Sequence, residues 1–257
     1  MTPISTAGIA VVTLDRQDTL NALTIELIDE VRMGLKDAVT RGAGALVIAG
    51  AGRAFCAGAD LGVVRSALES GPAPVMGPLI DSLNALMLEL RSAPFPTIVA
   101  IEGVAVGAGM GLALAADLRV ASKSARLVPG YFRIGASPDG GLTYLLIRAL
   151  GVARTTSLIL RNRSINSSEM LAHGLIEEIV EDGEALTAGH ALATEVLGSP
   201  SLALLQLRRL LDLATVNAFE QQLDAERQSI TAIWKTADFR EGVTAFLEHR
   251  RPSFTGS

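Results

Sequence analysis

The most constraining feature of the chain is an alternation of short apolar runs with segments of helical periodicity. The apolar runs are rich in β-branched residues and lie at positions 8–14, 45–49, 97–101, 118–121 and 176–180. Runs of this length and composition predict buried strands, and helical segments between them are typical of an α/β fold. We therefore expect a sheet built from these strands, with helices packed onto it.

The segment after Asn21 illustrates the helical pattern. Thr24 can cap the N-terminus of a helix, because its hydroxyl can accept a hydrogen bond from a free backbone N–H. Acidic residues then suit the positive end of the helix dipole, and apolar residues at helical spacing form one stripe. The acidic set is Glu26, Asp29 and Glu30, and the apolar set is Ile28, Val31, Leu35 and Val39.

Two later regions depart from this alternation. Residues 66–78 are rich in proline and glycine and predict an irregular, mobile loop over a pocket. From residue 200 onward no strand pattern remains, and apolar residues at helical spacing predict two helices, over 204–211 and 216–234. We therefore expect a core, residues 1–198, followed by a C-terminal helical region, residues 199–257.

The composition excludes several classes of protein. The chain has 257 residues, of which 49% are hydrophobic and 19% charged, which is ordinary for a globular protein. Its net charge of −5 and its 4% of aromatic residues argue against a nucleic-acid partner. Cys56 is the single cysteine and the three histidines lack zinc-site spacing, so neither a disulfide nor a metal is expected.

The sequence also predicts a cytoplasmic protein without a membrane segment. Residues 1–14 contain no basic segment leading into a long apolar core, so a secretory signal is not expected. The apolar stretch 103–116 is shorter than the about 20 residues that a spanning helix needs.

Two glycine-rich segments, 49–61 and 103–111, each follow a predicted strand. Small residues allow tight turns and leave backbone N–H groups accessible to a ligand. The second segment runs into alanine and leucine residues, which predict a helix whose first amides lack intrahelical acceptors. One amide from each segment, converging on a carbonyl oxygen, would form an oxyanion hole.

Two alternatives apply to these glycines. Either segment can be a tight turn that packs a helix closely against a strand. A dinucleotide site is excluded, because residues 107–111 do not follow the G-x-G-x-x-G pattern. Asp117 also follows too closely to be the acidic residue expected about 20 positions later.

Five motifs in the same order along the chain resemble those of the enoyl-CoA hydratase/isomerase (crotonase) superfamily. They are Leu-Asp-Arg at 14–16 with Asn-Ala-Leu at 21–23, Ala-Phe-Cys-Ala-Gly-Ala-Asp-Leu at 54–61, Glu-Gly at 102–103 with Gly-Ala-Gly at 107–109 and Asp-Leu-Arg-Val-Ala at 117–121, Pro-Asp-Gly-Gly at 138–141, and Glu-Gly-Val at 241–243 with Phe-Leu-Glu at 246–248, Pro252 and Phe254. The resemblance implies a spiral of ββα units followed by helices that assemble trimers or hexamers. It also implies an acyl-CoA substrate and no separate cofactor.

The resemblance further assigns residues to the site. It implies that the backbone amides of Ala57 and Ala108 hold the thioester oxygen, with Ala108 in place of the family's usual glycine. Contacts to coenzyme A are implied for two sets: Ala59, Asp60 and Leu61 in the first glycine-rich segment, and Arg16, Arg250 and Arg251 at the phosphates. Asp60 is also expected to tie down its own loop through backbone hydrogen bonds, and residues 62–92 to shape the acyl pocket.

The two glutamates of the family's hydratases are missing. The first position falls at Gly111 and the second at Gly130 or Tyr131. Asp139 is the sole carboxylate between Asp117 and Glu169, and several isomerases of the family carry an aspartate at this turn. The resemblance therefore favours an isomerase in which Asp139 moves a proton.

Three alternatives remain open from the sequence. Asp139 can instead cap the following helix. The protein can be a hydratase that uses Asp139 and a bound water, or an acyl-CoA binder without activity. Cys56, Glu102 and Asp117 are expected to be structural, because no histidine lies near Cys56 and neither acid is close in sequence to Ala108.

Overall fold

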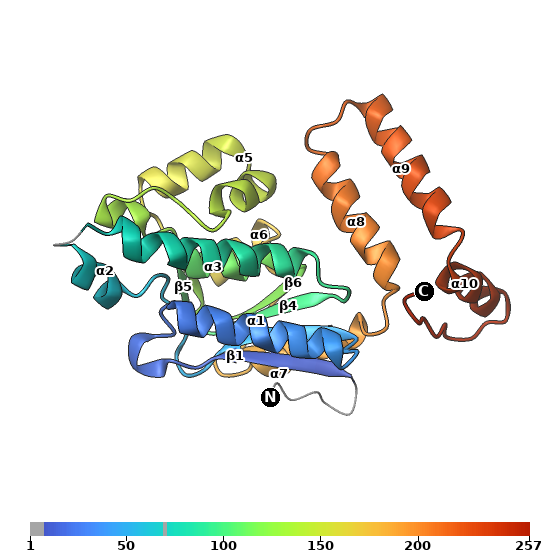
Figure 1. Cartoon of the computed structure of the whole chain (residues 1–257), viewed down its shortest axis with the longest axis horizontal. Helices are drawn as coiled ribbons and strands as arrows, with labels where there is room; N and C mark the ends of the chain where they lie inside the picture. Colours follow the sequence, from blue (N-terminus) through green and yellow to red (C-terminus); the bar gives the residue numbers. More distant parts are fainter. Residues whose placement is uncertain (1–7, 69–70) are drawn as a thin grey trace.

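The computed structural model describes residues 8–68 and 71–257. Its main sheet has five parallel strands in the order β1-β2-β4-β6-β9 (Figure 1). These strands are β1 (Ile9–Leu14), β2 (Ala45–Gly50), β4 (Thr97–Ile101), β6 (Leu118–Ser122) and β9 (Glu178–Val180). All five predicted strands are confirmed, although β9 begins two residues later than predicted.

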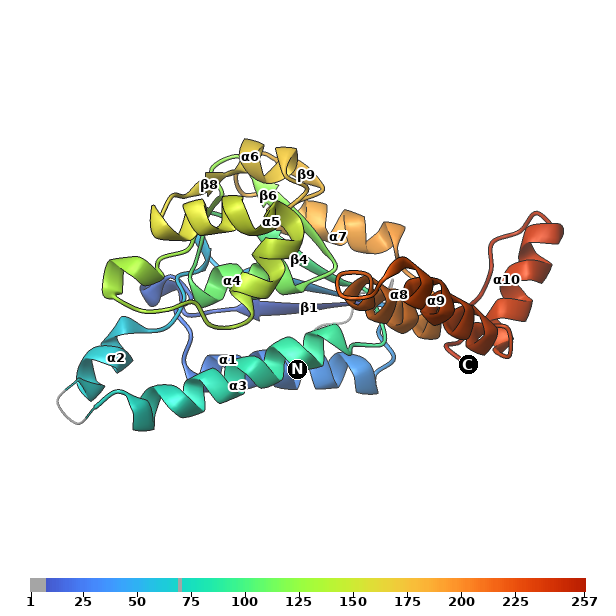
Figure 2. The same ribbon diagram turned by 90° about the horizontal axis from the view of Figure 1, so that it is seen from above.

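Alternate residues of these strands face two different cores, as the pleat of a strand requires. One face packs against α1 (Ile25–Thr40), α3 (Ala73–Arg91) and α4 (Ala108–Ala115), and the other against α7 (Ala185–Glu195). Figure 2 shows α1 and α3 side by side along one side of the sheet, with α7 on the other. Thr24 caps α1 as predicted, because its Oγ1 accepts a hydrogen bond from Leu27 N at 3.3 Å.

A second sheet, which the sequence pattern does not predict, has the order β3-β5-β7-β8. Its strands are β3 (Ala54–Cys56), β5 (Val104–Val106), β7 (Arg126–Val128) and β8 (Ile165–Asn166). Along the chain, a strand of the main sheet is followed three times by a strand of the second sheet and then by helix: β2-β3-α2, β4-β5-α4 and β6-β7-α5. This repetition confirms the predicted spiral of ββα units.

The predicted irregular loop over 66–78 is wrong for most of the segment. Helix α2 (Leu61–Ala67) occupies its start, and α3 begins at Ala73 with Pro72 as its N-cap. Prolines in a first turn cost little, because the N–H groups there have no intrahelical acceptor. Helix α3 also continues through Pro78. Residues 69 and 70 lie outside the described residues.

The C-terminal region contains three helices, one more than predicted. They are α8 (Ser201–Leu213), α9 (Phe219–Ile233) and α10 (Ala237–Leu247). Thr236 caps α10 through a hydrogen bond from Phe239 N to its Oγ1, so the chain turns and starts a new helix after Trp234. Figure 1 shows α8 and α9 as an antiparallel pair beside the core, with α10 beyond them.

The other helices are α5 (Leu142–Leu160) and α6 (Ser167–Ala172). Helix α5 is long and apolar enough to cross a membrane by length and composition alone. Its backbone is not helical at Gly151 (φ 75°, ψ 166°), which divides it into two shorter helices. Neither part reaches the about 20 residues that a spanning helix needs.

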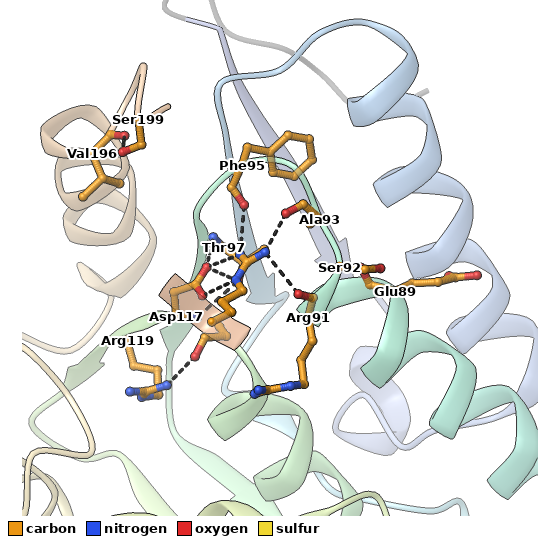
Figure 3. Close-up of polar contacts among 12 residues, drawn as sticks. Glu89, Arg91, Ser92, Ala93, Phe95, Thr97, Asp117, Arg119, Val196 and Ser199 are labelled. Carbon is orange, nitrogen blue, oxygen red and sulfur yellow. Dashed lines mark hydrogen bonds and ion pairs between the residues drawn. The ribbon is translucent and has the colours of Figure 1, made fainter. Parts of the chain in front are cut away.

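Arg208 of α8 joins the C-terminal helices to the core. Its Nε donates to Asp117 Oδ1 at 2.8 Å and its Nη2 to Asp117 Oδ2 at 2.6 Å. The same guanidinium donates to the carbonyls of Ala93 and Phe95 at 2.5 and 3.1 Å, and Thr97 N donates to Asp117 at 2.7 Å. Figure 3 shows Ala93, Phe95, Thr97 and Asp117 lying close to one another, joined by the dashed hydrogen bonds. The structural role predicted for Asp117 is confirmed.

The charge on Asp117 makes the stability of the fold depend on pH. Burial works to raise the pKa of Asp117, but hydrogen bonds from Arg208 and Thr97 outweigh burial and hold the pKa below its ordinary value. Because this pKa is lower in the folded state than the unfolded value of about 3.9, the stabilisation is present above about pH 4 and is lost as pH falls through the folded-state pKa. Urea unfolding measured across this range should show the loss. An Asp117→Asn variant should lack this part of the acid dependence, and an identical dependence in that variant would contradict the assignment.

Candidate active site

The first glycine-rich segment crosses from β3 to α2 and runs beside residues 20–23. Ala57 N donates to the carbonyl of Leu20 at 2.9 Å. This bond takes Ala57 N–H out of the predicted oxyanion hole, because a donor already bound to a backbone carbonyl is not free to bind a substrate oxygen. The predicted role of Ala57 is therefore corrected.

Ala59, two residues later, has the free amide that Ala57 lacks. It forms a parallel bridge with Leu23, in which Leu23 N donates to Gly58 O at 2.7 Å and Asp60 N donates to Leu23 O at 3.1 Å. Since successive N–H groups of an extended chain point to opposite sides, Ala59 N–H faces away from Leu23. No acceptor for this N–H lies within the part of the chain that the structure describes. Ala59, which the resemblance places at coenzyme A, is thus the available donor of this segment.

The second glycine-rich segment opens α4 at Ala108, as predicted. The first hydrogen bond along this helix runs from Gly111 N to Gly107 O at 3.1 Å. Ala108 N–H therefore has no intrahelical acceptor, and it lies at the positive end of the helix dipole. Ala108 is buried, so an oxygen bound there would be shielded from water.

The two segments meet at Gly58. A Cβ on Gly58 would lie 2.7 Å from the carbonyl oxygen of Val106 and 3.6 Å from Ala108 N. The backbone that carries the free amide of Ala59 therefore packs directly beside the free amide of Ala108. Gly58 also has φ of +85°, a conformation that favours glycine.

Gly58→Ala should destabilise the fold and disturb the junction, the contact at Gly58 between the two glycine-rich segments. The positive φ alone costs a non-glycine residue about 1–3 kcal/mol, and the new Cβ must move Val106 O or the Ala59 amide. We expect a lower urea midpoint and a larger loss in kcat than in apparent substrate affinity. Gly183→Ala is a matched control, because Gly183 has φ of +90° but open space at its Cβ position. Equal effects on kcat in both variants would contradict a role for the junction.

Asp139 lies at the turn before α5, close to the start of α4. Its Oδ1 accepts a hydrogen bond from the hydroxyl of Tyr131 at 2.6 Å. The carbonyl oxygen of Gly140 lies 3.1 Å from the position that a Cβ on Gly111 would occupy, so this turn packs on the first turn of α4. The capping alternative is not adopted, because α5 has Gly141 as its N-cap and no side chain caps it.

Tyr131 is the functional side chain that the sequence leaves unresolved. It is buried, and its ring lies 3.7 Å from the Cβ position of Gly107, immediately before α4. Burial raises the pKa of the Tyr131 hydroxyl, and the hydrogen bond to Asp139 raises it further. Of the two predicted positions for the second glutamate, Gly130 and Tyr131, only Tyr131 supplies a side chain to this site.

Asp60 ties down the first segment, as predicted. Its Oδ1 accepts from Gly62 N at 2.9 Å and caps α2, and its Oδ2 accepts from Arg16 Nη1 at 3.0 Å. Burial works to raise the pKa of Asp60, but these hydrogen bonds outweigh it and the pKa is lowered. Arg16 also donates to Ala22 O at 2.7 Å, so it braces this loop. Leu61, exposed at the first position of α2, is free to contact a ligand.

The two predicted phosphate contacts of the C-terminal region lie just after α10. Both carboxylate oxygens of Glu241 accept from Arg250, at 2.6 and 2.8 Å, and Glu248 accepts from its Nε at 2.7 Å. The hydrogen bonds from Arg250, together with one from Ser253 N, lower the pKa of Glu241 to about 2. Arg250 thus holds the chain end against α10, whereas Arg251 is exposed. Their contacts to coenzyme A stay predictions.

The other candidate groups have structural roles. Burial raises the pKa of the Cys56 thiol to about 12, so it is not a thiolate at neutral pH. Glu102 Oε2 accepts from Gly183 N at 3.0 Å. Within residues 8–68 and 71–257, no three His, Cys, Asp or Glu side chains gather to hold a metal ion.

The chain is similar to known proteins along nearly its whole length. The family model "Enoyl-CoA hydratase/isomerase" matches residues 5–257. The chain is 36% identical over 251 residues to 1,2-epoxyphenylacetyl-CoA isomerase of Escherichia coli strain K12, covering 97% of this chain and 95% of that protein. It is 38% identical over 250 residues, with the same coverage, to the "Probable enoyl-CoA hydratase" of Rhodobacter capsulatus. A crystal structure of an enoyl-CoA hydratase from Polaromonas sp. JS666 matches with a TM-score of 0.92, 30% identity and 99% of both chains covered. The chain therefore belongs to the enoyl-CoA hydratase/isomerase superfamily.

Proposed function

We propose that the protein is an acyl-CoA isomerase in which the amides of Ala59 and Ala108 bind the thioester oxygen and Asp139 moves the proton. The observation that carries this proposal is the position of Asp139. Its turn packs on the start of α4, where the free amides lie, and one of its oxygens is held by Tyr131. A single carboxylate beside an oxyanion hole suits proton transfer from one carbon to another.

The proposed reaction needs no group beyond these. Asp139 removes a proton from a carbon next to the thioester or conjugated with it, and the C–H electron pair moves onto the thioester oxygen. The two amides stabilise that oxyanion more than the neutral carbonyl, so they lower the barrier rather than only binding the substrate. Asp139 then returns the proton to a different carbon of the delocalised anion, and the double bond has moved.

The two-glutamate hydration mechanism finds no counterpart at the matching positions. Gly111 has no side chain, and a Cβ there would lie 3.1 Å from Gly140 O. Tyr131 is a phenol whose raised pKa keeps it protonated at neutral pH. A hydratase working here would need Asp139 itself to activate water.

A panel of unsaturated and ring-epoxide acyl-CoA thioesters, assayed by mass spectrometry in heavy water, tests the proposal. Isomerisation leaves the product with the substrate's composition apart from exchanged deuterium. Hydration of crotonyl-CoA at ordinary enzyme rates would overturn the proposal in favour of a hydratase. Tight thioester binding without turnover of any panel member would favour a binding protein instead.

A further inference from the structure

We infer that Tyr131 is a positioning residue for Asp139: its hydroxyl fixes one carboxylate oxygen, so that the other oxygen meets the substrate. This inference rests on the proposed function. It concerns one of the two positions, Gly130 and Tyr131, at which the resemblance places an acid of the family's hydratases, and it gives Tyr131 a different task.

The backbone holds Tyr131 firmly in place. Tyr131 begins the 3-10 helix Tyr131–Ile134, and its carbonyl accepts from Ala136 N at 3.0 Å. Just before it, Gly130 N donates to the Oδ1 of Asn162 at 2.8 Å. With the ring packed beside Gly107, the hydroxyl has little freedom, so it can define where Asp139 points.

The hydrogen bond from Tyr131 gives the two carboxylate oxygens of Asp139 different roles. Oδ1 accepts from Tyr131 at 2.6 Å, and no hydrogen-bond partner for Oδ2 lies within the described residues. Oδ2 is therefore the oxygen available to form the O–H bond as the substrate C–H bond breaks.

Few other charges act on Asp139. Helix α4 carries no titratable side chain, and from α3 it is the apolar Leu83 that packs at the neighbouring Gly140. Arg133, on the same 3-10 helix as Tyr131, is exposed and forms no ion pair within the described part of the chain. Tyr131 is thus the one titratable side chain that hydrogen-bonds to the Asp139 carboxylate among the described residues.

The test compares Tyr131→Phe with Tyr144→Phe. Tyr144 also donates to an aspartate at 2.6 Å, but its partner is Asp212 of α8. Removing the Tyr131 hydroxyl should lower kcat about tenfold and leave KM near the wild-type value, because the base loses its fixed orientation while the substrate contacts remain. Tyr144→Phe should keep both wild-type constants, and a wild-type kcat in Tyr131→Phe would overturn the inference.

A second readout does not need activity. The chain has two tyrosines, so the nuclear magnetic resonance signals of a tyrosine-labelled Tyr144→Phe variant report the ring of Tyr131 alone. Adding Asp139→Asn should shift these signals, because the charged acceptor of the Tyr131 hydroxyl becomes a neutral one. Unmoved signals would show that the two groups do not interact in solution, and would overturn the inference.

The two proposals fail in different ways. If Asp139→Asn keeps wild-type turnover, the proposed function is wrong. If Asp139→Asn is inactive while Tyr131→Phe keeps the wild-type kcat, the function stands and the positioning role is wrong.

Discussion

Asp139→Asn is expected to lower kcat for isomerisation by about 10²–10⁴-fold, the usual contribution of a general acid–base group. The amide keeps the shape of the carboxylate and can still accept the hydrogen bond of Tyr131, so the turn before α5 should stay in place. What disappears is the oxygen that takes the proton. The measurement is steady-state turnover together with exchange of substrate hydrogen for deuterium, and both should fall together.

Asp212→Asn is the matched control for this variant. Asp212 also accepts from a tyrosine hydroxyl at 2.6 Å, but it lies on α8 and pairs with Arg91. Its replacement should leave kcat near the wild-type value. Deuterium exchange that survives in Asp139→Asn at the wild-type rate would show that another group removes the proton.

Arg208→Ala is expected to lower the free energy of unfolding by about 3–5 kcal/mol, because it leaves the partly buried carboxylate of Asp117 without its partner. The guanidinium also satisfies the carbonyls of Ala93 and Phe95 (Figure 3), and alanine replaces none of these hydrogen bonds. Urea unfolding should show a lower midpoint, and proteolysis should increase between α7 and α8, where the C-terminal helices leave the core.

Arg209→Ala tests whether this loss is specific to the buried pair. Arg209 is the next residue of α8 and is exposed, with a 3.5 Å contact to Gln206. Its replacement should change the free energy of unfolding by about 0.5 kcal/mol or less. Similar losses in both variants would mean that the Asp117 pair is not what holds α8 to the core.

The main sheet was predictable because apolar runs rich in β-branched residues mark its strands, and β2 and β4 are buried along nearly their whole length. The second sheet was not, since β3, β5, β7 and β8 are two or three residues long and too short to show a periodicity. The segment around Pro72 was misjudged for a different reason. Prolines there occupy the start of α3, where the same residue type that breaks a helix interior is tolerated.

The local geometry of the site could be predicted where it follows from backbone position, and could not where it depends on a distant partner. Ala108 opens α4 as expected from the helix-forming residues after it. The engagement of Ala57 with Leu20 is invisible in the sequence, because it arises only when residues 20–23 fold beside the first glycine-rich segment. The pairing of Tyr131 with Asp139 is likewise a product of the 3-10 helix between them.

The contact between Gly140 O and Gly111 has a consequence for any substitution at position 111. The space in which a side chain at position 111 would begin is already bordered by the neighbouring turn, with only 3.1 Å to its carbonyl oxygen. An acid introduced at position 111 therefore meets this carbonyl first, and Gly140 O must give way by a few tenths of an ångström before the new side chain fits. A water-adding site with two acids would thus need a small shift of the turn around residue 140 as well as the substitution itself.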